Sequence, residues 1–152
     1  MSKTTQRISK LVAAIALAGA ASYSMAAAPI KIALAGPVTG PVAQYGDMQS
    51  MGALMAIEQI NKAGGVNGSM LEATTYDDAC DPKQAVAVAN KIVNDGIQFV
   101  VGHLCSGSTQ PAADIYEEEG ILMITAASTA PELTEKGHEL IFRTIGLDTM
   151  QG

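Results

Sequence analysis

Hydroxyl, thiol and carboxyl side chains gather in four short segments, each of which follows an apolar run. The segments are 37–45, 77–81, 102–109 and 126–129. The third, Gly-His-Leu-Cys-Ser-Gly-Ser-Thr, holds two serines and a threonine just before a helical pattern. Serine hydroxyls and free backbone N–H groups at a helix start match the acceptor oxygens of a carboxylate. We therefore predict an anion-binding loop with Ser106 as its principal hydroxyl donor.

A structural role is an open alternative for this loop. Either Ser106 or Ser108 can cap the following helix, because a serine hydroxyl commonly accepts a hydrogen bond from the first N–H groups of a helix. One residue can also do both. The local pattern leaves the two interpretations open.

The segment 126–129 adds donors at Ser128 and Thr129, and the Ala127 carbonyl can accept a hydrogen bond from an ammonium group. Stretches rich in Ser and Thr are usually turns, so composition alone favours a turn here. Tyr45 combines an aromatic face with a hydroxyl, which suits contact with an aliphatic group at a pocket rim. A half-buried tyrosine at a helix start is an equally common pattern.

The first 26 residues have the composition of a secretory signal peptide. Three basic residues precede an apolar run at 11–20, and the small residues that follow end at Ala26. This order of charged, apolar and small residues predicts export, with cleavage after Ala26 or alternatively after Ala28. The apolar run is too short for a stable membrane anchor.

Charge excludes one class of function. The predicted signal peptide holds three of the nine basic residues and none of the fifteen acidic ones, so a formal charge of −9 remains on 27–152. No basic cluster is left that can neutralise a phosphate backbone, and we predict no nucleic-acid binding.

Cys80 and Cys105 are the only cysteines. An even number of cysteines in an exported chain predicts a disulfide, which here joins the second and third segments. It would close about 26 residues and stabilise the fold by roughly 3 to 4 kcal/mol. A metal site would recruit His103 and His138 instead. The sequence lacks metal-ligand spacings such as Cys-x-x-Cys, so we predict no metal, and His103 is expected to be structural or solvent-facing.

A thiol enzyme is the other alternative for Cys105, because His103 lies two residues away and a helix start can lower the pKa of a thiol. The Gly-x-Ser-x-Gly pattern of a nucleophile elbow is absent. A cysteine paired with Cys80 is also unavailable for attack. We therefore predict that the protein is not an enzyme and needs no cofactor.

The order of apolar runs predicts how these segments are positioned. Strands are expected at 30–35, 70–76, 97–101 and 121–125, and the continuous apolar run at 97–101 suits burial on both faces. Helices are expected at 47–62, 82–95 and 108–119, the second with Asp81 as its N-cap and Pro82 at its first position. Apolar stripes are formed on the first helix by Ala53, Ala56, Ile57 and Ile60, and on the second by Ala85, Val88, Ala89 and Ile92. This β-α-β-α-β-α-β order predicts an α/β fold with a parallel, doubly wound sheet. In such sheets ligands bind beyond the carboxyl ends of the strands, where all four polar segments meet. A short apolar piece follows at Leu140 to Phe142.

At these segments the sequence resembles the branched-chain amino-acid binding proteins of bacterial ABC importers, which have the type I periplasmic-binding fold. The motifs are Gly-Pro-Val-Ala-Gln-Tyr-Gly-Asp at 40–47, Tyr-Asp-Asp-Ala-Cys-Asp-Pro at 76–82, Gly-His-Leu-Cys-Ser at 102–106 and Gly-Ile-Leu-Met-Ile-Thr at 120–125. The resemblance implies that 27–152 is the N-terminal lobe of a bilobal protein. We expect the chain to stop near the first hinge crossing.

The resemblance also implies a role for the site. Ser106 and Thr129 would hold an α-carboxylate, Thr129 and the Ala127 carbonyl an α-ammonium group, and Tyr45, Leu104 and Cys105 would line the pocket, with Ser128 as a further donor. The implied ligand is leucine, isoleucine or valine, the implied partner is a membrane permease, and the full-length form is expected to be monomeric. Amide-binding regulators and sensor ectodomains share this architecture and are the alternative.

Overall fold

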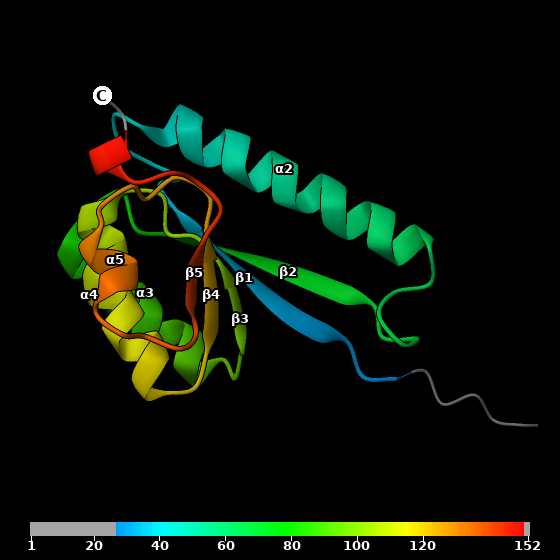
Figure 1. Cartoon of the computed structure of the whole chain (residues 1–152). Coiled ribbons are helices and arrows are strands. Elements are labelled where there is room, and N and C mark those ends of the chain that lie inside the picture. The colour runs from blue at the N-terminus through cyan, green and yellow to red at the C-terminus, as the bar shows by residue number, and fades with distance from the viewer. Residues whose placement is uncertain (1–26, 151–152) are drawn as a thin grey trace, which may run out of the picture.

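A computed structural model describes residues 27–150, and the predicted signal peptide lies outside them (Figure 1). Five parallel strands form one sheet in the order β2-β1-β3-β4-β5. They are β1 (Ile30–Gly36), β2 (Leu71–Asp77), β3 (Phe99–Val101), β4 (Leu122–Thr125) and β5 (Ile141–Arg143). The predicted α/β class with a parallel sheet is confirmed. The short apolar piece near Leu140 is the fifth strand.

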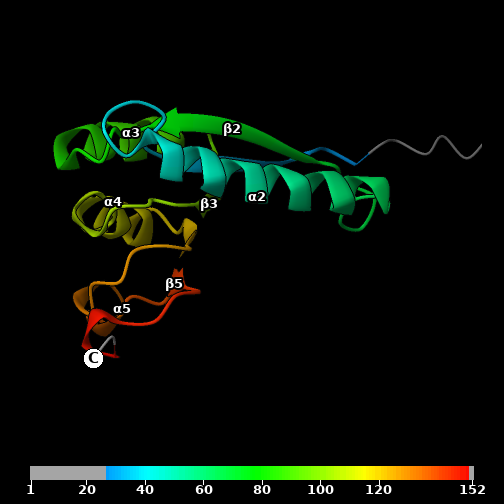
Figure 2. The same ribbon diagram turned by 90° about the horizontal axis from the view of Figure 1, so that it is seen from above.

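Helices cover both faces of the sheet (Figures 1 and 2). The long helix α2 (Ala43–Lys62) lies on one face, and α3 (Pro82–Asn94), α4 (Ser106–Glu118) and the short α5 (Glu132–Glu135) lie on the other. A single turn of 3-10 helix, η1 (Asp148–Met150), follows β5. Among residues 27–150, no helix combines the length and apolar composition that spanning a membrane requires.

The core lies between the sheet and the layer formed by α3 and α4. Its fully buried members include Ala33, Ala35 and Met123 from the strands, Ala85, Ala89 and Ile92 from α3, and Ala112, Ala113 and Tyr116 from α4. The alanines allow the two helices to approach the sheet and each other closely, so that the core is filled by a few large side chains between small ones.

Helix α3 forms as the sequence predicts. Asp81 precedes it in an extended conformation, and its carboxylate accepts a hydrogen bond from the N–H of Gln84 at 2.8 Å. Pro82 occupies the first helical position, where its missing N–H leaves nothing unpaired. Gly96 follows the helix with a φ of +68°, a conformation that glycine adopts without strain.

Helix α2 differs from the prediction at its start. It begins at Ala43, four residues before the predicted 47–62, because a turn in which the N–H of Ala43 donates to the carbonyl of Gly40 leads directly into it and Ala43 and Gln44 are good helix formers. Tyr45 therefore lies in the first turn of the helix and not in a loop.

The predicted burial of β3 on both faces is wrong. Helix α2 packs against β1 and β2, so the face of β3, β4 and β5 on its side is left open. Phe99, Ile124 and Phe142 on these strands are 42%, 38% and 47% exposed. Ile60, at the end of the predicted apolar stripe of α2, is 38% exposed for the same reason. An apolar pattern shows which residues favour burial but not which element covers them.

Candidate ligand-binding site

The carboxyl ends of the parallel strands bring the four polar segments together. β1 and β2 are paired over their full lengths, so Gly36 and Asp77 lie opposite each other where the strands end. The loops after β3 and β4 reach the same edge. A pocket of about 360 Å³ opens there, lined by Tyr45, Met48, Gln49, Leu104, Ala126 and Ala127. Three of these residues, Tyr45, Leu104 and Ala127, are predicted site residues.

The start of α4 presents donor groups at this edge. The residue before the helix is Cys105, whose carbonyl accepts hydrogen bonds from the N–H groups of Ser108 and Thr109, each at 2.9 Å. Among residues 27–150, no acceptor pairs with the N–H groups of Ser106 and Gly107. These two groups and the Ser106 hydroxyl are therefore the donors that this helix end can offer to an anion.

Neither serine of the loop caps the helix. Ser106 is the first helical residue, and its hydroxyl accepts a hydrogen bond from the N–H of Ala130 at 3.3 Å. The hydroxyl of Ser108 is buried and has no hydrogen-bond partner within the described residues. The capping alternative is therefore wrong for both residues.

The three predicted residues after β4 lie in different environments. Ser128 is fully buried, and its hydroxyl lies 2.6 Å from that of Thr109 and donates to the carbonyl of Leu104 at 3.1 Å. The hydrogen-bonding capacity of the Ser128 hydroxyl is therefore used within the protein. Ala127 lines the pocket, whereas Thr129 is half-buried and is not among the residues that line it. Of the two hydroxyls, that of Thr129 is the one left to meet a ligand.

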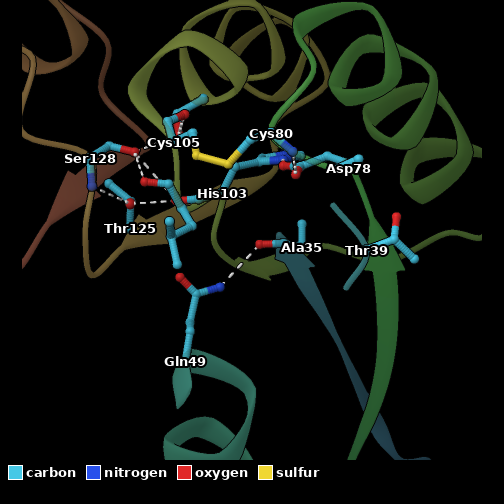
Figure 3. Close-up of a disulfide and its surroundings, with 12 residues drawn as sticks. Ala35, Thr39, Gln49, Asp78, Cys80, His103, Cys105, Thr125 and Ser128 are labelled. Atoms are coloured by element: carbon cyan, nitrogen blue, oxygen red, sulfur yellow. Dashed lines mark hydrogen bonds and ion pairs between the residues drawn. A yellow bond between two sulfur atoms is a disulfide. The ribbon is translucent and has the colours of Figure 1, made fainter. Parts of the chain in front are cut away.

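Tyr45 and Cys105 lie at the edge of the candidate site. Tyr45 is 51% exposed at the pocket rim, next to Met48. Cys105 forms a disulfide with Cys80, with their Cα atoms 5.6 Å apart, and Figure 3 shows this bond beside the loop residues. The predicted disulfide is confirmed. Because both cysteines are bonded, neither provides a thiolate for the thiol-enzyme alternative.

The carboxylate of Asp77 organises the loop after β1. It accepts hydrogen bonds from the N–H groups of Val38, Thr39 and Ala79 at 2.8, 3.2 and 2.9 Å, and from the Thr39 hydroxyl at 2.6 Å. Partial desolvation raises the pKa of Asp77, but these hydrogen bonds outweigh it and hold the pKa below its usual value. Asp77 thus fastens the loop that leads into α2 and Tyr45.

Sequence reasoning missed a buried polar cluster behind the pocket. His103 is fully buried, with Nδ1 2.5 Å from Oδ2 of Asp78 and Nε2 3.0 Å from the hydroxyl of Tyr116. His103 is therefore structural and not solvent-facing, which were the two roles expected for it from the sequence. The three residues are far apart in the sequence, and no local pattern links them. Residues 27–150 contain no group of three or more His, Cys, Asp or Glu side chains that can hold a metal ion.

The chain matches the family described as "Periplasmic binding protein" over residues 29–152. It is 78% identical over 152 residues to the leucine-, isoleucine-, valine-, threonine-, and alanine-binding protein of Pseudomonas aeruginosa, covering all of this chain and 41% of that protein. It is 61% identical over 143 residues to the Leu/Ile/Val-binding protein of Escherichia coli strain K12, covering 94% of this chain and 39% of that protein.

The chain is also similar in structure to solved amino-acid binding proteins. The branched-chain amino acid transporter substrate binding protein LivJ from Streptococcus pneumoniae, in complex with isoleucine, aligns with a TM-score of 0.75 and 30% identity over 80% of this chain and 35% of that chain. The leucine binding protein LivK from Thermotoga maritima aligns with a TM-score of 0.73 and 27% identity over 80% of this chain and 34% of that chain. The chain thus spans about two fifths of the length of the curated relatives.

Proposed function

Because the chain belongs to the periplasmic binding protein family, we propose that it forms part of the solute-binding component of an ABC importer for leucine, isoleucine and valine. The proposal places the protein in the periplasm, where it would deliver its ligand to a membrane permease without catalysing a reaction. The names of relatives that are 78% and 61% identical support this ligand class. The full-length form is proposed to be a monomer.

The observation that carries the proposal is the meeting of donors and an apolar pocket at one edge of the sheet. The hydroxyl of Ser106 and the free N–H groups of Ser106 and Gly107 lie at the start of α4, next to Leu104, which lines the pocket. An α-carboxylate needs such donors, while a branched aliphatic side chain needs apolar walls. An amino acid of this class satisfies both at once.

We assign the roles as follows. Ser106 and Thr129 hold the α-carboxylate, and Thr129 together with the Ala127 carbonyl holds the α-ammonium group. Tyr45, Leu104 and Cys105 form the wall around the ligand. Ser128 supports the site from behind, since its hydroxyl is already bonded to Thr109 and Leu104.

Isothermal titration of the full-length gene product tests the proposal. Leucine, isoleucine, valine, threonine, a charged amino acid and an aliphatic amide are titrated in turn. Saturable binding of the branched-chain amino acids with no heat from the charged one is the expected result. A preference for the amide would favour a regulator of the same fold, and it would withdraw the roles given to Ser106 and Thr129.

A further inference from the structure

Three side chains form a hydrogen-bonded row behind the candidate site, which we call the imidazole bridge: Asp78, His103 and Tyr116. All three side chains are fully buried. The imidazole lies in the middle, 2.5 Å from the carboxylate and 3.0 Å from the phenol oxygen. The imidazole and phenol rings are also stacked, with centroids 5.9 Å apart. Asp78 follows β2, His103 follows β3 and Tyr116 belongs to α4, so the bridge joins three separate elements.

Every polar group of the row has a partner within the row. Burial, and then the negative charge of Asp78, raise the pKa of Tyr116, so its hydroxyl keeps its proton. The hydroxyl can then donate to Nε2 while the Nδ1–H donates to the carboxylate of Asp78, and both nitrogens of a neutral imidazole are satisfied. Every polar atom that the imidazole carries is used inside the protein. Such a fully paired buried network holds one geometry firmly.

The backbone around the bridge leads directly to the ligand loops. The carbonyl of His103 accepts a hydrogen bond from the Thr125 hydroxyl at 2.6 Å, and Figure 3 shows this bond beside Ser128. The same Thr125 oxygen accepts a hydrogen bond from the N–H of Ser128 at 3.1 Å. At the other end, Oδ1 of Asp78 accepts a hydrogen bond from the N–H of Cys80 at 2.8 Å. The bridge is thus coupled to both the loop after β4 and the disulfide.

We propose that the imidazole bridge, with His103 as the positioning residue, sets the direction of the donor groups at the start of α4 for ligand binding. This inference rests on the proposed function of the site. The disulfide holds the loop after β3 at Cys105, and the Ser128 hydroxyl holds it at the carbonyl of Leu104. The side chain of His103 adds a third fixed point two residues before Cys105, and the three points together define the orientation of Ser106 and Gly107.

The test compares two tyrosine variants of the full-length protein that lose the same group. Tyr116→Phe removes the hydroxyl at the end of the bridge. Tyr76→Phe is the control, because Tyr76 is also buried and its hydroxyl donates to Asp95 at 2.6 Å, outside the bridge. We expect Tyr116→Phe to weaken leucine binding by about 5- to 30-fold, the factor that corresponds to one or two kcal/mol. Tyr76→Phe is expected to change it by less than about twofold.

A second readout does not depend on the ligand. Amide hydrogen exchange reports local opening at hydrogen-bonded amides. In Tyr116→Phe the amides of Ser108 and Thr109, which are bonded to the carbonyl of Cys105, should therefore exchange faster than in the wild type and in Tyr76→Phe. Equal binding and equal exchange in the two variants would overturn the inference. If the wild type binds no amino acid, only the proposed function fails, and the exchange comparison still decides whether the bridge positions the loop.

Asp78→Asn provides the second variant if Tyr116→Phe does not fold. The substitution keeps the shape of the side chain and removes the charge that accepts the Nδ1–H. In the wild type, the imidazole proton should give a slowly exchanging resonance in the proton spectrum, and Asp78→Asn should shift or abolish it while speeding amide exchange at Ser108 and Thr109. Unchanged exchange at these two amides would contradict a positioning role.

Discussion

The hydroxyl oxygen of Ser106 accepts a hydrogen bond from the backbone N–H of Ala130 at 3.3 Å. This contact joins the start of α4 to the loop after β4, which carries the other residues proposed to hold the polar groups of the ligand. Because the hydroxyl acts here as an acceptor, its proton stays available for a ligand oxygen. A single side chain thus supports the loop and keeps a proton to donate.

Ser106→Ala should therefore weaken ligand binding strongly. A hydrogen bond to a charged group contributes about 1.5 to 3 kcal/mol, which corresponds to roughly a 10- to 100-fold loss of leucine affinity. Ser108→Ala is the matched control, because the Ser108 hydroxyl is buried and has no partner among residues 27–150. Removing it should leave the affinity unchanged and keep or raise the free energy of unfolding. Equal affinities of the two variants in calorimetric titration would refute the role of Ser106.

The disulfide should be present in the native exported protein and should stabilise it. We expect thiol titration of the folded protein to find no reactive cysteine. For a sequence separation of 25, reduction or the double substitution Cys80→Ala with Cys105→Ala should lower the free energy of unfolding by roughly 3 to 4 kcal/mol. Chemical unfolding with and without reductant measures this difference, and the doubly substituted variant should show no response to reductant. A reactive thiol in the native protein would revive the enzyme alternative.

Two glycines of α2 should respond to alanine in opposite directions. A Cβ at Gly46 would lie 1.9 Å from the carbonyl oxygen of Pro37, whereas a Cβ at Gly52 would meet nothing within 4 Å. Gly46→Ala should therefore destabilise the fold by about 1 to 3 kcal/mol through overpacking. Gly52→Ala should stabilise it by about 0.5 to 1 kcal/mol, because alanine has the higher helix propensity. Urea unfolding of both variants tests the predicted contrast in sign.

The stability of the loop after β1 should depend on pH through Asp77. The pKa of Asp77 in the folded protein lies below the ordinary value of 3.8. Its stabilising effect is therefore complete well above pH 3.8 and is lost as the pH falls through the folded pKa. Asp77→Asn removes this dependence, so its stability should fall less than that of the wild type between pH 5 and pH 3, about one unit either side of that value. Urea unfolding at each pH measures the free energy of unfolding of both proteins. An equal fall in the two proteins between pH 5 and pH 3 would show that Asp77 does not contribute.

Much of the fold could be predicted from local patterns. Asp81, Pro82 and the apolar stripe of α3 are confirmed in full, since a cap, a proline and a helical period all act within one element. The extent of α2 and the open face of β3 were predicted wrongly. A helix start without a side-chain cap gives no sequence signal, and burial of Phe99 depends on whether another element covers it.

Some features of the candidate site could be predicted from the sequence, and others could not. Cysteine count and export predicted the bond between Cys80 and Cys105, and the serine-rich start of α4 predicted the donors, because each of these signals belongs to residue type and short spacing. That Ser128 faces the interior while Ser106 stays at the site could not be predicted. Both are small hydroxyl residues in loops, and their direction depends on backbone geometry set by neighbouring strands.

The sequence by itself determined the element order, the cap of α3, the disulfide and the edge of the sheet where the polar segments meet, because these depend on residue type and on contacts within short stretches. Only the tertiary structure decided that Asp78, His103 and Tyr116 form one row of hydrogen bonds. The carboxylate and the imidazole are 25 residues apart, and the imidazole and the phenol are 13 apart. Their meeting follows from parallel strand pairing and from the packing of α4, which bring distant residues to one place.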